Sequence, residues 1–300
     1  MSASSQQEQV IPALPRTQTV VMGRQGFFSV VLRLIGVELY KLRCRMMSKV
    51  LAIIAILATI ISSALVAWIT PDPLELTNVV TLVAQTLNIV GLILIIILAG
   101  TIVGGEYSVG TVRLMLTRGP TRAQYLFAKL GAILTCIVTG VVSLTVLGSI
   151  VAVLFGLTKT GVSQFNFFAG ALAPSLVWYI LATILSLFVY GAMACCLSVL
   201  GKTAAAGVAG TILWWVVEGL VDNILPWIGS LSKGLLSDFL KAIPDYLIGR
   251  NISTLAQNTL AESDSTTMLA SLHALLVLVG YLILFIGLAW WVNKRRDVIN

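Results

Sequence analysis

Charged residues are scarce in this chain of 300 residues. Only 10% are Asp, Glu, Lys or Arg, whereas 58% are hydrophobic. A typical soluble domain has about 25% charged and roughly 45–50% apolar residues. A chain with so little charge cannot cover itself with a water-soluble surface. The composition therefore excludes a soluble globular protein and predicts an integral membrane protein.

The residue sets that carry common catalytic chemistry are also missing. His273 is the only histidine, so neither an H-E-x-x-H motif nor a histidine cluster can form, and no G-x-S-x-G occurs. The four cysteines show no C-x-x-C spacing. Gly201-Lys202-Thr203 ends like a nucleotide-binding P-loop, but Cys196 stands where that motif needs its first glycine. We predict no catalytic, cofactor or metal site in this chain and disfavour an intramembrane enzyme.

Six apolar stretches are long enough to cross a bilayer. A helix needs about 20 apolar residues to span a hydrocarbon core of ~30 Å, and its backbone must satisfy its own hydrogen bonds there. The sequence therefore predicts an all-α polytopic membrane protein with six transmembrane helices. The predicted spans are 50–69, 79–103, 131–155, 173–199, 204–221 and 269–292.

The basic residues predict the orientation of these spans. With the N-terminus inside, fifteen of the 19 Lys and Arg residues fall on the inner side and four on the outer side. Because inner loops are enriched in Lys and Arg, we expect both termini to be cytoplasmic, in a multi-pass protein of the cell (plasma) membrane. The net charge of +7 is spread over the ends of apolar spans, so nucleic acid is not expected as a partner.

The residues before the first span divide into a tail and a helix. Residues 1–24 are rich in Ser, Gln, Pro and Thr and predict a flexible cytoplasmic tail. An apolar helical face follows, formed by Phe28, Leu32, Ile35, Leu39 and Leu42. Cations lie on another side, namely Arg33, Lys41 and Arg45. The pattern predicts an N-terminal interfacial helix with its cations toward lipid headgroups; an inner extension of span one is the alternative.

The segment 104–130 joins spans two and three on the inner side and is unusually polar. It exceeds the usual helix–helix loop of about 2–8 residues. Thr121 and Gln124 fit a capping box, so a helix is expected to begin near Arg122 and to continue into span three. The charge in this segment predicts a surface for a soluble partner. Simple anchoring of the helix ends by positive charge is the alternative.

Two motifs in the chain resemble those of a known transporter family. The first is the run Glu106, Gly110-Thr111, Arg113, Pro120, Arg122 and Lys129 after span two. The second is E-L-x-K-L before span one, here Glu38-Leu39-Tyr40-Lys41-Leu42. Together with six spans and a large outer loop between spans five and six, these are similar to the permease subunits of type-2 ABC exporters, of the bacitracin-resistance-permease kind.

The resemblance implies a transport subunit without its own ATPase site. Residues 25–300 would form the permease domain, and a cytoplasmic ABC ATPase subunit would bind ATP and press on the segment after span two. A second permease copy or a related permease would complete the pathway, giving a dimer. Carried over residue by residue, the candidate ATPase-coupling contacts are Glu106, Gly110, Thr111, Arg113, Arg118 and Arg122.

Glu218 is an acidic residue within a predicted span. An ionisable group inside the bilayer is costly and is a functional candidate for that reason. Two interpretations are open: Glu218 lines a substrate path at the subunit interface, or it reaches the outer water one turn before Asp222. Such residues would also suit a self-contained secondary carrier or channel, which is the alternative function.

The remaining predictions concern contacts and the outer loop. Gly100-x3-Gly104 and Ala206-x3-Gly210 are small-residue pairs that allow close helix approach, weakly indicating a dimer seam. In the outer loop, 222–268, Pro226 and Pro244 are expected to interrupt short helices that dip into the outer leaflet.

Overall fold

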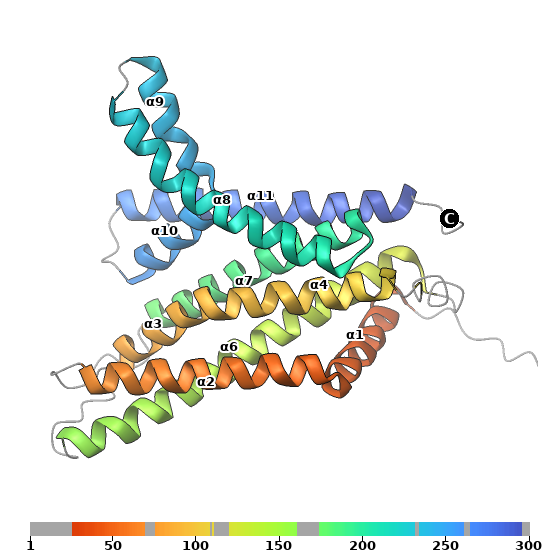
Figure 1. Cartoon of the computed structure of the whole chain (residues 1–300), viewed down its shortest axis with the longest axis horizontal. Helices are drawn as coiled ribbons and strands as arrows, with labels where there is room; N and C mark the ends of the chain where they lie inside the picture. The colour runs from red at the N-terminus through yellow and green to blue at the C-terminus, as the bar shows by residue number, and fades with distance from the viewer. Residues whose placement is uncertain are drawn as a thin grey trace, which may run out of the picture.

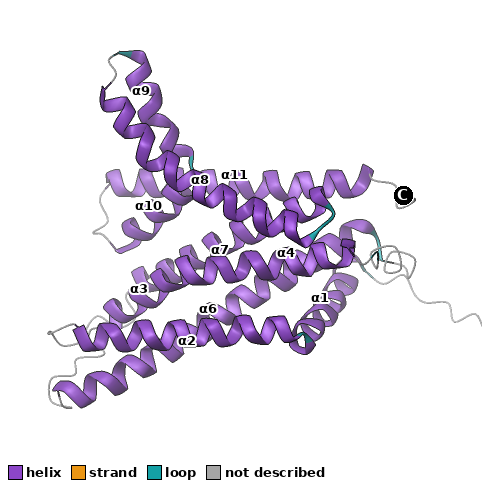
Figure 2. Cartoon of the chain, viewed as in Figure 1, coloured by secondary structure: helices purple, strands orange, loops and turns teal. Residues whose placement is uncertain are grey.

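The protein is helical throughout the part of the chain that its computed structural model describes. That part comprises residues 26–69, 76–108, 110, 120–160, 174–231, 234–260 and 265–295. Within those ranges no strand occurs (Figure 2), and six helices are long and apolar enough to cross a membrane. The all-α class and the six candidate spans are thus confirmed.

The helices follow the predicted order. The first span is α2 (Met46–Ile69), preceded by α1 (Phe27–Cys44), and the second combines α3 (Leu76–Thr86), the π-helix η1 (Leu87–Gly91) and α4 (Leu92–Ser108). The other spans are α6 (Arg122–Thr160), α7 (Pro174–Gly201), α8 (Ala204–Leu231) and α11 (Ser265–Arg295). Between α8 and α11 lie α9 (Leu235–Ala242), the 3-10 helix η3 (Ile243–Tyr246) and α10 (Ile248–Leu260).

The predicted capping box at the start of span three is confirmed. The N–H of Gln124 donates to Thr121 Oγ1 at 3.3 Å, and the Gln124 side chain accepts the N–H of Thr121 at 2.8 Å, which is a reciprocal capping box. Helix α6 accordingly begins at Arg122. Between α7 and α8, Lys202 adopts a left-handed conformation with φ of 55°, and Thr203 Oγ1 accepts the N–H of Ala206 at 3.1 Å. The chain therefore makes a tight turn there.

Helix α4 lies at the centre of the bundle, packed on α7 and α8 (Figure 1). Its side chains Ile96, Ala99 and Ile102 are almost wholly buried. Gly100 and Gly104 face α8: a Cβ on Gly100 would meet Val208, and one on Gly104 would collide with the backbone of Thr203 and Ala204. These small residues therefore bring two helices of the same chain together.

This packing corrects the interpretation of the small-residue pairs as a dimer seam. On α8, a Cβ at Gly210 would meet Leu197 of α7, and one at Gly207 would collide with Ser198. Spacing alone does not say which helix approaches a small-residue pair. In the folded chain both pairs are taken up by contacts among α4, α7 and α8, and they supply no free seam for a second copy.

Helix α1 is separate from span one, since it ends at Cys44 and Arg45 is extended. It packs against α6, where Ile35 lies over Gly131. A Cβ added to Gly131 would lie 2.5 Å from Ile35 Cδ1. The assignment of Lys41 to lipid headgroups is wrong, because its ammonium group faces two carboxylates inside the bundle. The placement of α1 at the membrane interface stays a prediction.

Helix α8 also runs further than predicted. Span five was expected to end at 221, with Pro226 as an interruption, but the helix continues through Pro226 to Leu231. The end of α8 is held against α9, because Ser237 Oγ donates to Gly229 O at 2.7 Å. Contacts with a neighbouring helix thus outweigh the local cost of a proline. In Figure 1 the end of α8 and α9 form an arm that projects from the bundle.

Adjacent glycines on α4 provide a matched test of this packing. A Gly104→Ala substitution should lower the free energy of unfolding by about 1–3 kcal/mol, because its Cβ meets backbone that cannot move aside. Gly105→Ala should be neutral or stabilising by up to about 1 kcal/mol, since nothing lies within 4 Å of that Cβ. Thermal unfolding of the purified chain in lipid nanodiscs measures both. Equal melting temperatures for the two variants would contradict the close α4–α8 contact.

Candidate functional site

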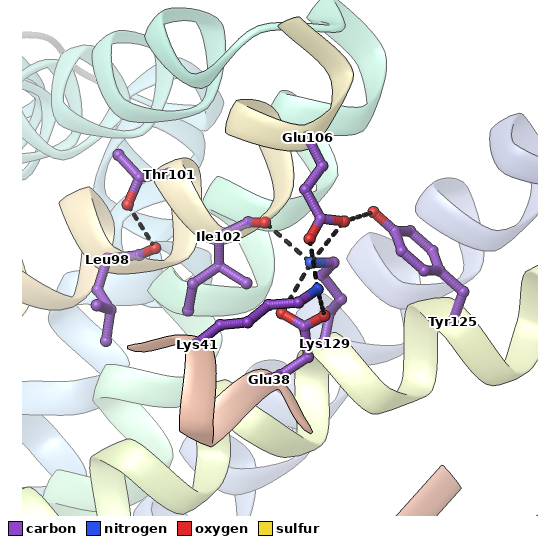
Figure 3. Close-up of polar contacts among 8 residues, drawn as sticks. All are labelled: Glu38, Lys41, Leu98, Thr101, Ile102, Glu106, Tyr125 and Lys129. Atoms are coloured by element: carbon purple, nitrogen blue, oxygen red, sulfur yellow. Dashed lines mark hydrogen bonds and ion pairs between the residues drawn. The ribbon is translucent and has the colours of Figure 1, made fainter. Parts of the chain in front are cut away.

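Four charged side chains from three helices meet at the end of the bundle that carries the segment 109–121. Glu38 and Lys41 come from α1, Glu106 from the last turn of α4, and Lys129 from α6 (Figure 3). Two are carboxylates and two are ammonium groups, so the set is electrically neutral. We call these four residues the ionic cluster.

Lys129 is at the centre of the ionic cluster. Its side chain is only 1% exposed, and its ammonium nitrogen lies 3.0 Å from Glu38 Oε2 and 2.9 Å from Glu106 Oε2. It also donates to the carbonyl oxygen of Ile102 at 3.0 Å. An ammonium group has three donor hydrogens. All three are directed at acceptors, so Lys129 is fully satisfied without water.

The other members close the ring of charges. Lys41 Nζ donates to Glu38 Oε1 at 2.8 Å and to Glu106 Oε1 at 3.1 Å, so each carboxylate bridges both ammonium groups. Burial lowers the pKa of Lys41, but its hydrogen bond to Glu38 and the charges of both carboxylates outweigh that effect and raise its pKa overall. Tyr125 adds a hydrogen bond from its hydroxyl to Glu106 Oε2 at 2.7 Å.

Helical spacing explains how the sequence places these groups. Residues three or four apart share a helix face. This applies to Glu38 and Lys41 on α1 and to Tyr125 and Lys129 on α6. Glu106 reaches both faces from the end of α4. Buried charges are tolerated when they are paired and hydrogen-bonded, so the neutral ring holds α1, α4 and α6 together at this point.

A second set of bonds attaches the same region to the end of α11. Tyr107 donates to Asn293 Oδ1 at 3.3 Å, and Asn293 Nδ2 donates to the carbonyl oxygen of Arg122 at 3.2 Å. The Arg122 guanidinium donates to the carbonyl oxygens of Asn293 and Lys294 at 3.0 and 3.1 Å. A cation at these carbonyls complements the negative end of the helix dipole. Tyr107 and Arg122, which flank residues 109–121, are thereby both attached to the end of α11.

Three of the six predicted coupling residues are described by the structure, and each lies in a different place. Glu106 is 5% exposed and lies in the ionic cluster, whereas Arg122 lies at the end of α11. Gly110 has φ of 73° and its N–H donates to the carbonyl oxygen of Tyr107 at 3.2 Å, a turn conformation that favours glycine. Thr111, Arg113 and Arg118 lie outside the described residues.

Sequence reasoning did not predict the roles of some residues in this region. The pairing of Glu38 and Lys41 with Glu106 and Lys129 was not predicted, although Glu38, the only acidic residue of α1, could have pointed to a cation inside the bundle. Asn293 had no such signal, because a polar residue near a helix end is ordinarily solvated. Tyr125 was likewise indistinguishable from an interfacial aromatic residue.

Glu218 does not reach the outer water. Glu218 is only 4% exposed, so the interpretation that it reaches the outer water is wrong. Its Oε1 accepts the N–H of Gly249 at 2.6 Å, and its Oε2 accepts the hydroxyl of Tyr190 at 3.1 Å. Gly249 is in the first turn of α10, where N–H groups have no partner within the helix. Glu218 therefore links α8 to α7 and to the start of α10.

The described ranges contain no grouping of three or more His, Cys, Asp or Glu side chains that could hold a metal ion. The charged groups of the ionic cluster are paired with one another, so the role that the geometry supports is structural. The cluster fixes three helices relative to one another and offers no unpaired group for acid–base or nucleophilic work.

Removal of one charge from the ionic cluster should be costly. Lys129→Met should lower the free energy of unfolding by about 3–5 kcal/mol, because two carboxylates then share one ammonium group in a buried place. Lys129→Met combined with Glu106→Gln restores neutrality and should be less destabilised than Lys129→Met alone. Thermal unfolding of the nanodisc-embedded chain compares the two variants.

The matched control for this measurement is Arg250→Gln. Arg250 pairs with Asp222 and Asp245 at 3.2 Å each, but its side chain is 42% exposed. Exposed ion pairs contribute about 0–1 kcal/mol. A double variant less stable than Lys129→Met would show that charge balance does not govern the stability of the cluster.

Comparison with known proteins gives one match. The model of a family described as "Protein of unknown function (DUF2705)" matches residues 52–299, which cover spans one to six. No curated protein matches the chain. Because the match covers well over half of the 300 residues, the chain belongs to the DUF2705 family.

Proposed function

We propose that this chain is the membrane-spanning permease subunit of an ATP-driven exporter of the ABC type. A separate cytoplasmic ATPase subunit hydrolyses ATP and binds the segment 104–130. A second copy of the chain, or a related permease, completes the transport pathway across the cell membrane. Both termini are cytoplasmic in this arrangement, as the distribution of Lys and Arg favours.

The ionic cluster is the observation that supports the proposal most. The resemblance to exporter permeases rested on two motifs that are distant in sequence, one before span one and one after span two. Their charged members Glu38 and Lys41 meet Glu106 and Lys129 in one neutral, buried ring. The two motifs thus meet in space beside the polar segment. Such a meeting is expected if the segment transmits movement from the ATPase to the helices.

The bonds around the segment suggest how a push on it would spread. Glu106 and Tyr107 hold its start to α1, α6 and α11, and Arg122 holds its end to α11. Separation of buried opposite charges is expensive at low dielectric constant. The four helices would therefore move as one unit when the ATPase displaces the segment.

In the proposed cycle, the ATPase closes on ATP and displaces the segment, and the helices attached to it reorient the pathway from the inner to the outer side. Coupling requires that substrate binds the two orientations with different affinity. In this scheme Glu106 is a positioning residue, whereas Arg113 and Arg118 remain candidates for direct ATPase contact.

A self-contained carrier or channel is the second candidate function. Two observations favour it: Glu218 is buried within span five, and span two contains the π-helix η1. Ionisable residues and irregular helices at membrane depth are features of such carriers. Substrate flux in vesicles that contain this chain alone distinguishes the two functions, because an ABC permease subunit needs its ATPase.

Charge reversal in the segment should abolish binding of the ATPase. We expect the affinity-tagged chain, purified from its native membranes, to carry a subunit with a Walker A motif and ATPase activity. Arg113→Glu combined with Arg118→Glu should lower the co-purified ATPase activity about tenfold or more, because reversed charges oppose a complementary surface. Arg122 is left unchanged in this variant since it holds the end of α11.

Lys241→Glu on α9 serves as the control, because it reverses a charge in a helix remote in sequence from the segment. It should leave the co-purified activity unchanged. The coupling assignment is wrong if both variants retain equal ATPase activity, or if the native complex contains no ATP-hydrolysing subunit.

A further inference from the structure

A cavity of about 380 Å³ lies between span two, α7, α8 and α10. It is distinct from the ionic cluster, because none of its lining residues belongs to that cluster and its lining residues on span two, within 85–92, lie well before Glu106. Its volume falls in the range of small-molecule sites, about 300–1,000 Å³. We call it the polar chamber.

The polar chamber is lined by hydrogen-bonding groups that carry no charge. Among its described lining residues there is no Asp, Glu, Lys, Arg or His. The hydrogen-bonding side chains include Asn88, Tyr179, Ser186, Tyr190, Ser253 and Gln257. Of these, Tyr179, Ser186 and Tyr190 are at most 3% exposed. An anionic ligand group would find no counter-charge there, and the Glu218 carboxylate lies directly behind Tyr190 and Gly249. An uncharged polar group would find hydrogen-bond partners in the wall.

Hydrogen bonds within the wall determine which groups are offered to a ligand. Tyr190 donates its only hydroxyl hydrogen to Glu218 at 3.1 Å, so its oxygen is left to accept. Ser186 Oγ has one hydrogen and two acceptors, Asn88 Oδ1 at 2.7 Å and the carbonyl oxygen of Thr183 at 2.8 Å. With Asn88 Oδ1 turned toward Ser186, the amide nitrogen of Asn88 is left to donate. The wall thus presents both a donor and an acceptor, the combination that a hydroxyl group satisfies.

The backbone at Asn88 is itself unusual. Asn88 lies in the π-helix η1, which interrupts span two over Leu87–Gly91. Single-turn π-helices are rare and occur frequently at functional sites. The extra residue in this turn changes the helical register, and Asn88 within it faces Ser186 of α7.

The rim of the chamber indicates how a ligand would enter. Ile89 is 58% exposed beside Gln85, and Ser253 and Gln257 on α10 are also exposed. An apolar residue exposed on a membrane span faces lipid. Trp215 adds an aromatic surface to the wall, which suits the apolar carbon face of a compact headgroup.

We propose that the polar chamber binds the uncharged, hydroxyl-bearing headgroup of an amphiphile whose tail remains in the lipid. A neighbouring cavity of about 410 Å³ provides the contrast: it lies between α2, span two and α6, and most of its lining is aliphatic. That cavity suits an apolar chain and has no comparable set of hydrogen-bonding side chains.

Photolabelling tests the proposal with a defined probe. The full chain in phosphatidylcholine nanodiscs is labelled with decyl glucoside that carries a diazirine next to its headgroup. Labelled peptides are expected from residues 85–92, 179–190 and 249–257. Excess unlabelled decyl glucoside should reduce this labelling about tenfold. Decyl sulfate should not, because its anionic head has no counter-charge in the chamber. Decyltrimethylammonium should not, because its head can neither donate nor accept a hydrogen bond.

Two variants locate the site further. Asn88→Leu and Ser186→Ala should each lower specific labelling about fivefold, as expected for a lost hydrogen bond of ordinary strength. The control is Ser143→Ala, a lining residue of the aliphatic cavity, which should leave labelling unchanged. Competition on the unaltered chain remains decisive if a variant does not fold.

Equal displacement by all three amphiphiles, or labelling confined to the aliphatic cavity, would overturn the proposal. The labelling requires neither ATP nor an ATPase. Its failure would therefore leave the coupling proposal intact, and failure of the ATPase co-purification would leave the chamber intact.

Discussion

The attraction between opposite charges in a place without water is the interaction on which this structure depends most. Moving an isolated ion from water into a protein interior costs several kcal/mol or more of solvation free energy. Lys129, 1% exposed, is therefore acceptable only with its carboxylate partners in place. Those partners come from α1 and α4. The requirement to pair Lys129 therefore fixes the positions of these two helices relative to α6.

Glu106 and Glu218, both buried carboxylates, are stabilised in different ways. Glu106 faces two ammonium groups and a tyrosine hydroxyl, so its charge is neutralised. Glu218 receives hydrogen bonds from Tyr190 and from the backbone of α10. Charge pairing needs long side chains from several helices and gives a rigid joint. Hydrogen-bond donors suffice for Glu218 because the N-terminus of α10 already carries a partial positive charge.

Local patterns in the sequence predicted the elements well, because each depends on residues close in the chain. The spans follow from apolar length, and the start of α6 follows from Thr121 and Gln124. The ionic cluster could not be predicted, since it depends on how α1 packs against α6. Lys41 looked like a headgroup contact by its helical face alone. Pro226 was predicted to interrupt the helix because proline usually does so. The contact with α9 that holds the end of α8 depends on tertiary packing, which the local sequence does not indicate.

Span two connects the two proposed sites. Glu106 lies at one end of it and Asn88 lies 18 residues earlier, about 27 Å away along a helix with a rise of 1.5 Å per residue. Gly100 and Gly104 hold α4 firmly against α8, and Ser198 Oγ donates to Gly100 O at 3.3 Å. A displacement at Glu106 would consequently travel along α4 as a rigid body. The π-helix η1 is the first irregular turn that it would meet, and Asn88 lies within that turn, facing Ser186. A mechanical signal from the ionic cluster would therefore first change geometry at the wall of the polar chamber.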